Sequence, residues 1–286
     1  MKLLEVLNSS TSALKGNGIE DARLNVELML CHIFSCDRVK LYLEFEKPLS
    51  AGELDIMRNM LRRRLKGEPL QYILGETEFM DCRILVNPSV LIPRPETECL
   101  VEVLIDDIKS KQLTDVKILE VGTGSGCIPI AVSKELSRLN VKHKIVSLEI
   151  SKSAIETAEQ NKKINDIADD QLTIVERDFL KMNKLSNQIN YLISNPPYIN
   201  ATDYKLLDKA ISGFEPKVAL TDESDGLTFY RKFLHILSEA TYKFSCIFEI
   251  AYDLSEKLED LMKENSLTDY YFYKDLNGIE RVLKIG

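Results

Sequence analysis

Apolar residues recur at helical spacing in two segments near the start of the chain, over residues 22–33 and 54–65. The positions are Ala22, Val26, Met29 and Ile33 in the first segment, and Leu54, Met57, Leu61 and Leu65 in the second. A helix that carries one apolar stripe must cover it against a neighbour. The pattern therefore predicts a small helical bundle over residues 1–75.

A basic run closes the second of these helices. Arg62, Arg63 and Arg64 with Lys66 lie near its end, and Gly67 supplies a stop. Cations are favoured near the negative end of the helix dipole, so we expect a solvated helix face here. A patch that binds a partner is the alternative interpretation.

The pattern changes over residues 68–95, which show no helical period. Short extended pieces such as residues 83–86 are separated by glycine and proline, at Gly75, Pro88, Pro93 and Pro95. We expect a hairpin and a loop, with residues 76–95 linking two domains. A helix should follow over about residues 96–111.

Farther along, short β-branched runs alternate with helical segments. The expected strands are residues 116–121, 144–150, 172–176, 191–194 and 245–250, and the expected helices include residues 128–139, 153–164 and 226–243. Such alternation predicts a parallel sheet with helices on both faces. Residues 270–274 and 281–285 flank Asn277-Gly278, a strong hairpin signal, so the last two strands should be antiparallel neighbours. We therefore expect an α/β fold over residues 96–286, with the Rossmann-like seven-stranded sheet of S-adenosylmethionine-dependent methyltransferases.

Composition agrees with two folded domains. The chain has 286 residues, of which 44% are apolar and 29% are charged. Nowhere do 18 apolar residues run together, and charges interrupt the first thirty residues. Neither a membrane span nor a secretory signal is expected, and the protein should be cytoplasmic. The six cysteines form no C-x-x-C pair, which favours buried free thiols over disulfides or a metal site.

Charge divides unevenly along the chain. Residues 1–75 hold 11 Lys and Arg against 10 Asp and Glu, and residues 76–286 hold 26 against 35, which gives net charges of +1 and −9. An acidic C-terminal part is a poor match for a phosphate backbone. This lowers the expectation of nucleic-acid binding without excluding it.

A glycine-rich loop follows the first strand of the expected sheet. It reads Glu120, Val121, Gly122, Thr123, Gly124, Ser125 and Gly126, and a helix comes next. Glycines allow a sharp turn and a close approach to a ligand. Because position 127 is Cys, the loop has neither the Lys of a phosphate loop nor the third glycine or alanine of a dinucleotide fingerprint. It is similar to the methyltransferase loop, in which Glu120 would face the methionine ammonium; a structural turn is the alternative.

Acidic residues end the next two strands. Glu149 lies 23 residues beyond Gly126, near the spacing at which a carboxylate meets ribose hydroxyls. A charge at the start of the following helix is a second role for Glu149, compatible with the first. Asp178 is expected to accept from the adenine amino group and Phe179 to pack on the ring, although an ordinary core position suits Phe179 equally well.

The fourth strand ends in Asn195, Pro196, Pro197 and Tyr198. Ligands collect at the carboxyl edge of an open α/β sheet, so Asn195 should lie beside whatever the glycine loop holds. A planar NH₂ group can donate one hydrogen to the Asn195 side-chain oxygen and the other to the Pro196 carbonyl, while Tyr198 would form a wall over its plane. The alternative interpretation is that residues 195–198 form only a rigid turn at the end of the strand.

Two such acceptors suit a weak nitrogen nucleophile. An amide or aromatic NH₂ has its lone pair delocalised, and holding both hydrogens favours a pyramidal nitrogen aimed at a sulfonium methyl group. No histidine is needed, and His32, His143 and His235 lie outside these loops.

At this level of detail the sequence resembles the family of peptide chain release factor glutamine methyltransferases, called HemK or PrmC, over nearly its whole length. Besides the glycine loop and residues 195–198, the resemblance includes Arg-Arg-Arg at 62–64, Glu-Pro-Leu-Gln-Tyr-Ile-Leu-Gly at 68–75, Val-Leu-Ile-Pro-Arg-Pro-Glu-Thr-Glu at 90–98, Phe-Glu-Pro at 214–216, Ala-Leu at 219–220, Asp-Gly-Leu at 225–227 and Glu-Arg-Val at 280–282. The segments around Gln71 and Arg94 discriminate this family from generic methyltransferases.

The resemblance implies methyl transfer from S-adenosylmethionine to the glutamine side chain of the Gly-Gly-Gln loop in release factors. It implies a helical substrate-recognition domain at 1–75 and a catalytic domain at 96–286. Separately from the resemblance, we expect a monomer that makes no direct contact with nucleic acid. Residues 122–126, Glu149, Phe179 and Asn195 would surround the cofactor, residues 195–198 would hold the glutamine amide, and Arg94 would border the same cleft.

The sequence departs modestly from the family pattern. Glu120 and Glu149 stand where the family more often has Asp, and Ala251 stands where it usually has Gly.

Two other functions are weighed against this interpretation. One is methylation of the adenine amino group in DNA or RNA, whose geometry also suits Asn-Pro-Pro-Tyr. The other is a non-catalytic binding protein on an inherited fold.

Overall fold

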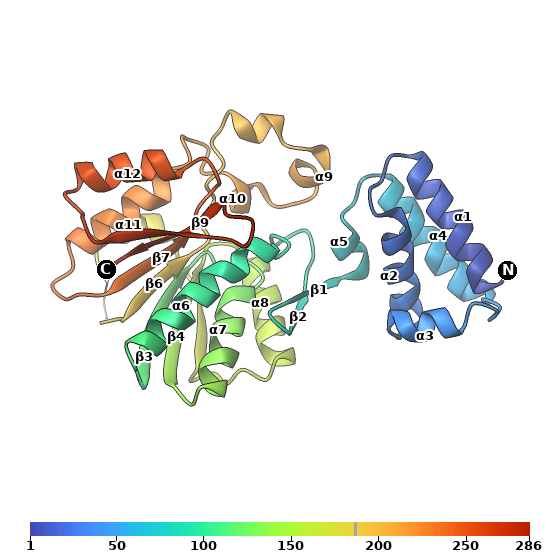
Figure 1. Cartoon of the computed structure of the whole chain (residues 1–286), viewed down its shortest axis with the longest axis horizontal. Coiled ribbons are helices and arrows are strands. Elements are labelled where there is room, and N and C mark those ends of the chain that lie inside the picture. Colours follow the sequence, from blue (N-terminus) through green and yellow to red (C-terminus); the bar gives the residue numbers. More distant parts are fainter. Residues whose placement is uncertain (186–187) are drawn as a thin grey trace. The chain divides into compact units, whose positions relative to one another are not determined.

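The computed structural model describes residues 1–185 and 188–286. Their contacts divide the chain into two compact units, each drawn in Figure 1. The helical unit comprises residues 1–75 and 208–214, and the sheet unit comprises residues 76–207 and 215–286. Among the described residues, every helix is too short or too polar to span a lipid bilayer.

The first 75 residues of the helical unit form α1 (Leu3–Gly16), α2 (Ala22–Phe34), α3 (Arg38–Leu43), α4 (Ala51–Leu65) and α5 (Leu70–Leu74). The first predicted stripe is confirmed, because Val26 and Met29 are buried in one hydrophobic cluster. The second is confirmed only in part: Met57 is buried in the same cluster, but Leu65 at the end of α4 is exposed. A capping box starts α4: the Ser50 hydroxyl accepts the Glu53 N–H, and the Glu53 carboxylate accepts the Ser50 N–H. The bundle thus follows from apolar periodicity and a cap that the sequence supplies.

Residues 68–95 differ in part from the prediction. Helix α5 lies at their start, where no helix was expected, because five residues are too few to show a helical period. The hairpin is confirmed as β1 (Glu76–Phe79) and β2 (Cys82–Leu85), which pair antiparallel. Its two central residues, Met80 and Asp81, both have positive φ, as a tight two-residue hairpin turn requires.

The basic run is only partly the solvated face that we expected. Arg62 is exposed, as predicted. Arg63 instead donates to both carboxylate oxygens of Glu68, at 2.8 and 2.6 Å. Arg64 donates to the side-chain oxygen of Asn25 at 2.8 Å and to the Glu68 carbonyl. The expectation was therefore wrong for these two arginines, which tie α4 to α2 and to the segment before α5.

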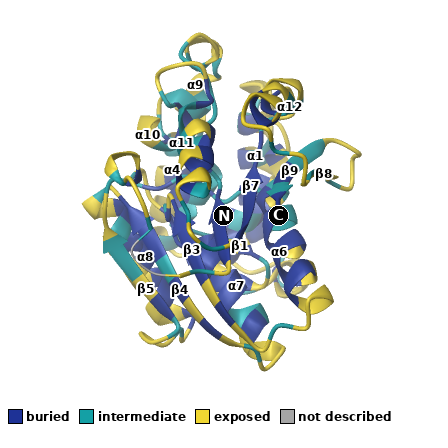
Figure 2. Ribbon diagram, turned by 90° about the vertical axis from the view of Figure 1, so that its left-hand side faces the viewer, coloured by how far each residue is buried: buried dark blue, intermediate teal, exposed yellow. Residues whose placement is uncertain are grey.

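The sheet unit holds the predicted seven-stranded sheet. Its strands are β3 (Asp115–Val121), β4 (Lys142–Glu149), β5 (Leu172–Glu176), β6 (Tyr191–Ser194), β7 (Ser245–Glu249), β8 (Tyr270–Lys274) and β9 (Glu280–Ile285). Their order is β5-β4-β3-β6-β7-β9-β8. Strands β3 to β7 are parallel. Strands β8 and β9 are antiparallel neighbours, as the terminal hairpin predicted, and β9 is also antiparallel to β7. Figure 2 shows the burial of β3 and β7, as expected for strands covered on both faces.

Helices cover both faces of this sheet (Figure 1). One layer contains α6 (Glu98–Ser110), α7 (Cys127–Arg138) and α8 (Lys152–Ile164), and the other contains α11 (Thr228–Ser238) and α12 (Ser255–Glu264). The connections within the sheet unit include the short helices η1 (Pro95–Thr97), η2 (Phe179–Lys181), η3 (Asp203–Leu206) and α10 (Lys217–Leu220), whereas α9 (Lys209–Ser212) belongs to the helical unit. The helix expected over residues 226–243 is shorter than predicted, because α11 ends at Ser238.

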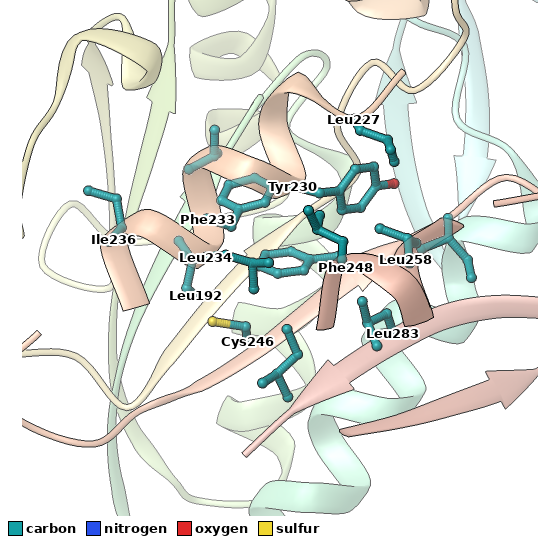
Figure 3. Close-up of a cluster of buried hydrophobic side chains, with 14 of the residues drawn as sticks. Leu192, Leu227, Tyr230, Phe233, Leu234, Ile236, Cys246, Phe248, Leu258 and Leu283 are labelled. Atoms are coloured by element: carbon teal, nitrogen blue, oxygen red, sulfur yellow. The ribbon is translucent and has the colours of Figure 1, made fainter. Parts of the chain in front are cut away.

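Aromatic side chains fill the core between α11 and the sheet (Figure 3). The rings of Phe233 on α11 and Phe248 on β7 stack with centroids 4.2 Å apart. The Tyr230 ring meets Phe248 edge-on, and its hydroxyl donates to the backbone carbonyl of Glu249 at 2.7 Å. This packing fixes α11 against the end of β7.

A buried ionic cluster lies near the amino ends of the parallel strands. Asp107 on α6 accepts from the Tyr191 hydroxyl at 2.8 Å and pairs with Lys111 at 2.9 Å. Lys284 on β9 donates to its other carboxylate oxygen. The carboxylate is thus paired at both oxygens, and these partners lower the pKa of Asp107 against the opposing effect of burial.

Candidate functional site

A cavity of about 580 Å³ opens at the carboxyl ends of β3, β4 and β6. The loop after β3, the end of β4, the loop after β5 and the loop after β6 all contribute to its lining. Parallel strands bring their carboxyl ends to one edge, which is where ligands collect in open α/β sheets. Of the predicted site residues, the cavity is lined by Gly122, Thr123, Gly124, Ser125, Glu149, Asp178, Phe179, Asn195, Pro196, Pro197 and Arg94.

The glycine-rich loop turns from β3 into α7 at the floor of the cavity. Gly122, Gly124 and Gly126 all have positive φ, which side chains with a Cβ rarely adopt. At Gly126 a Cβ would also lie 3.2 Å from the Cβ of Ala158 on α8. The last glycine therefore serves helix packing, while the first two shape a backbone that faces the cavity.

Glu149 holds the loop and lines the cavity. Its carboxylate accepts the N–H of Gly124 at 2.9 Å, and the N–H groups of Ile150 and Ser151 at 2.8 and 2.9 Å. Ile150 and Ser151 lead directly into α8, so the predicted charge at a helix start is present. Three of about four acceptor positions are used, which leaves capacity on Oε2 for a ligand hydroxyl.

Glu120 lies beneath the loop and is not among the residues that line the cavity. The Ser147 hydroxyl donates to its Oε2, while Oε1 is buried without a partner in the described chain. Burial is the main reason that the pKa of Glu120 is raised to about 8; the Ser147 hydrogen bond opposes the rise, and the negative charge of Glu149 adds to it. Thr123 Oγ1, in the cavity lining, is another buried polar atom without a partner among the described residues.

Asp178 and Phe179 follow β5 at the side of the cavity. Asp178 accepts the N–H of Leu180 at 3.0 Å and pairs with Lys181 at 3.1 Å. Phe179 is 3% exposed, and its ring centroid lies 5.0 Å from that of Phe233. The core interpretation of Phe179 is therefore confirmed. The residue also lines the cavity, and packing of its ring on adenine stays a prediction.

Asn195 has a defined orientation at the end of β6. Its Nδ2 donates to the Thr97 hydroxyl oxygen at 3.2 Å. Its Oδ1 has no hydrogen-bond donor within the described residues, so an acceptor remains available. Pro196 and Pro197 line the cavity beside it. The structure thus brings the predicted acceptors to the same cavity as the glycine loop.

Tyr198 does not line the cavity with Asn195, Pro196 and Pro197. It is absent from the cavity lining, and its hydroxyl donates to Glu249 Oε1 at 3.3 Å. Its side chain packs against the hydrophobic cluster between α11 and the sheet. The Tyr198 carbonyl lies close against Gly226, where an added Cβ would be only 2.4 Å from the carbonyl oxygen. The wall expected from this ring is therefore not formed by Tyr198 in this conformation.

Arg94 borders the cavity, as the resemblance implied, and it has a buried partner. Its guanidinium donates to Glu215 Oε1 at 2.5 Å, and Glu215 Oε2 accepts the Ile92 N–H at 3.4 Å. The Glu215 side chain is only 2% exposed, against 35% for Arg94. The pair joins the segment before η1 to the segment before α10.

Several residues at this site were missed by residue-level reasoning. Thr97 orients Asn195, Glu215 anchors Arg94, and Asp222 accepts the N–H groups of Gly226 and Thr228 in the cavity wall. Glu249 receives the Tyr198 hydroxyl. The sequence indicated Glu249 only as a single carboxylate within the apolar run 245–250.

Comparisons with known proteins identify the relatives of this chain. Residues 5–75 match the model of the PrmC N-terminal domain, and residues 96–214 match the methyltransferase small domain. A release factor glutamine methyltransferase of Geobacter sulfurreducens is 34% identical over 98% of this chain and 94% of its own length. One from Flavobacterium psychrophilum is 33% identical over 87% of this chain and 86% of its own.

Solved structures support the fold. The N-terminal domain of human METTL16 superposes with a TM-score of 0.52 at 17% identity, covering 78% of this chain and 81% of that one. The same domain in complex with SAH gives a TM-score of 0.51 at 16% identity, with 79% and 83% covered.

Proposed function

This chain belongs to the family of release factor glutamine methyltransferases, and on that premise we propose that it methylates peptide chain release factors. The acceptor is the side-chain amide nitrogen of the glutamine in their Gly-Gly-Gln loop. The observation that carries this proposal is the Asn195 amide, whose NH₂ is engaged by Thr97 while its oxygen is free beside the glycine loop.

The methyl donor is S-adenosylmethionine, which supplies an electrophilic sulfonium methyl group when bound. The residues in and beneath the cavity fit this methyl donor. Thr123 Oγ1 in the cavity lining and Glu120 Oε1 beneath the loop are buried without partners among the described residues, and an ammonium group can supply a donor to either oxygen. Glu149 keeps an acceptor position for ribose hydroxyls, and Asp178 with Phe179 offers an acceptor and an apolar surface for the adenine.

Asn195 and Pro196 prepare the substrate amide. The Asn195 Oδ1 and the Pro196 carbonyl accept one hydrogen each from the glutamine NH₂ and orient its lone pair. A carbon–nitrogen bond forms as the carbon–sulfur bond breaks, which leaves S-adenosylhomocysteine, and the nitrogen then loses one proton to solvent. The same two acceptors stabilise the positive charge that grows on nitrogen, so orientation and electrostatics replace a strong base.

The remaining parts have supporting roles. We assign residues 1–75 to recognition of the release factor and residues 96–286 to catalysis, with residues 76–95 as the linker. Arg94, fixed by Glu215, borders the substrate's path, and Pro197 and Tyr198 keep the preceding acceptors in place. The protein is expected to act as a cytoplasmic monomer and to make no direct contact with nucleic acid.

The decisive experiment incubates the protein with purified release factor and S-adenosylmethionine carrying a labelled methyl group. We expect peptide mass spectrometry to find one methyl group on the glutamine of the Gly-Gly-Gln loop, and none on a release factor with glutamate at that position. Adenine-containing DNA and RNA are offered in the same assay. Methylation of nucleic acid without methylation of release factor would favour the adenine alternative.

A further inference from the structure

One face of α8 carries buried polar side chains that the mechanism above does not use. Thr157 and Asn161 lie on it, four residues apart, and Asn165, which caps the end of the helix, continues the same face. Their exposed fractions are 3%, 0% and 6%. A buried hydroxyl or amide costs stability unless it is hydrogen-bonded, so the partners of these residues show what this face holds.

The partners lie in residues 83–89, at the end of β2 and in the chain that follows it. We call the hydrogen-bonded pairs the polar ladder: Asn165 with the Arg83 carbonyl (2.8 Å), Asn161 with the N–H and the carbonyl of Leu85 (2.7 and 2.9 Å), Thr157 with the Asn87 side chain (2.9 Å), and the Ser153 carbonyl with the Ser89 hydroxyl (3.2 Å). Four residues of helix advance by about 6.0 Å and two residues of extended chain by about 6.6 Å, so the two repeats stay in step. The polar ladder thus fixes residues 83–89 to α8.

Asn161 differs from the rest of the polar ladder because it also binds the glycine-rich loop. Its amide nitrogen donates to the Leu85 carbonyl and, at 2.8 Å, to the carbonyl of Ser125. A side-chain amide has two hydrogens, and each of the two segments receives one. Asn165 and Thr157 make no hydrogen bond to the loop within the described chain.

The Ser125 carbonyl belongs to the peptide group that closes the glycine-rich loop. This group is planar and trans, so holding its carbonyl directs the Gly126 N–H to the opposite side. There the N–H donates to the Thr123 carbonyl at 2.8 Å. Thr123 and Ser125 line the cavity, whereas Asn161 lies outside it. Asn161 therefore helps to shape the floor of the cavity from behind.

The polar ladder also leads into a wall of the cavity. Residues 83–89 continue directly into Val90, Leu91, Pro93 and Arg94, which line the cavity together with Ser89. Helix α8 thus holds the floor and the start of this wall in one register. Among the described residues of the polar ladder, Asn161 alone is hydrogen-bonded to both.

We propose that Asn161 is a positioning residue that couples the glycine-rich loop to residues 83–89, so that a cofactor bound to the loop also orders the wall that carries Arg94. This inference rests on the part of the proposed function that concerns S-adenosylmethionine, and it is independent of the methyl acceptor.

The first test uses the native chain. Amide hydrogen exchange is measured over residues 83–87 with and without saturating S-adenosylhomocysteine. These residues do not line the cavity, so the ligand does not cover them directly. We expect exchange at Leu85, whose N–H is bonded to Asn161, to slow about tenfold, because a coupling between two segments acts in both directions.

The hairpin of β8 and β9 corrects this measurement for general stabilisation by the ligand, since it belongs to the same unit and lies outside the cavity lining. Leu85 should slow more than the amides of that hairpin. A response at residues 83–87 no larger than the response of the hairpin would overturn the proposal.

The second test compares two buried asparagines. Asn161→Ala removes the hydrogen bonds to both segments. Asn165→Ala is the matched control, because Asn165 is bonded to the Arg83 carbonyl and to Lys134 but not to the loop. Calorimetry should show the Kd for S-adenosylhomocysteine raised about 10- to 30-fold in Asn161→Ala and changed less than about twofold in Asn165→Ala. Both variants should melt at a lower temperature, since each leaves buried carbonyls without donors.

The exchange response at residues 83–87 should likewise disappear in Asn161→Ala and persist in Asn165→Ala. A residue that only stabilised the fold would lower the melting temperature without this contrast. Unchanged affinity in folded Asn161→Ala, or equal losses of affinity in the two variants, would overturn the proposal. If Asn161→Ala does not fold, exchange in the native chain decides.

Neither measurement involves a release factor. A chain that shows the expected binding and exchange but leaves release factor unmethylated would refute the proposed function and leave this inference standing. Methylated release factor with no exchange response at residues 83–87 would do the reverse.

Discussion

The two ends of the seven-stranded sheet treat buried carboxylates in opposite ways. Near the amino ends of the parallel strands, Asp107 receives Lys111 and Lys284, and these partners lower its pKa. At the carboxyl ends, Glu120 and Glu249 each keep one oxygen without a well-formed hydrogen bond among the described residues. Burial raises the pKa of Glu120 to about 8 and that of Glu249 to about 7.

This difference distinguishes the amino ends of the strands, where the buried charge stabilises the fold, from the carboxyl ends, where the site lies. A buried charge that is fully paired holds elements together and gains nothing from a ligand. A buried charge that is left short of partners costs stability, and a ligand or a substrate that supplies the missing partner gains binding energy from it. The same sheet therefore has one edge optimised for folding and one that is completed by its ligands.

The largest effect should come from removing an acceptor at the functional edge. Asn195→Ala is expected to lower kcat about 10²- to 10³-fold, roughly 3 to 4 kcal/mol of transition-state stabilisation. The melting temperature should change little, because Asn195 contributes a single side-chain hydrogen bond, to Thr97. Steady-state kinetics with release factor and thermal melts measure the two quantities. Full activity in this variant would contradict the assigned role of Asn195.

Asp107→Asn should give the opposite result. Replacing the carboxylate leaves Lys111 and Lys284 without their counter-charge, and we expect a loss of about 3 kcal/mol in the free energy of unfolding. The substitution lies away from the cavity, so kcat of the folded fraction should stay at the native value. Urea unfolding and kinetics below the midpoint provide the measurements. A loss of kcat with unchanged stability would break the distinction between the two edges.

Glu120 tests the pH dependence of the functional edge. Its folded-state pKa is raised, so between about pH 5 and pH 8 the folded protein binds more protons than the unfolded chain, and stability should fall as pH rises. Glu120→Gln should flatten this slope, by roughly 3 kcal/mol between the two ends. Unfolding curves at several pH values, without cofactor, measure it.

The cofactor supplies the control for that experiment. An ammonium group near Glu120 stabilises its ionised form, so saturating S-adenosylmethionine should also reduce the slope in the native chain. An identical slope in Glu120→Gln and in the native protein would mean that other groups set the pH dependence.

The architecture of the sheet was predictable from local patterns. Alternating β-branched runs and helical segments indicated five parallel strands, and Asn277-Gly278 indicated the terminal hairpin, because both signals are carried by a few neighbouring residues. Helix α5 was not predictable, since five residues do not complete two turns. The glycine loop and Asn195 were assigned to one cavity from strand order alone, which the carboxyl-edge rule justifies.

Side-chain direction at the site was harder to predict. Residues 195–198 leave the strand, so the alternation that assigns strand residues to one face no longer applies to Tyr198. Its hydroxyl meets Glu249, which lies 51 residues away in the sequence, on the neighbouring strand. Pairings over that separation depend on the packed structure, and the sequence pattern records only that a carboxylate interrupts an apolar run.

The smallest expected effect concerns the Tyr198 hydroxyl. In this conformation it touches only Glu249 among the described residues, at 3.3 Å, and the ring packs in the core. Tyr198→Phe keeps the ring and removes that long hydrogen bond, so we expect kcat to fall about threefold, or under 1 kcal/mol. Tyr198→Ala, which also empties the core position, should cost stability as well. A loss of kcat above about 30-fold in Tyr198→Phe would mean that the hydroxyl contacts the substrate, and that Tyr198 is one of the residues that bind the ligand.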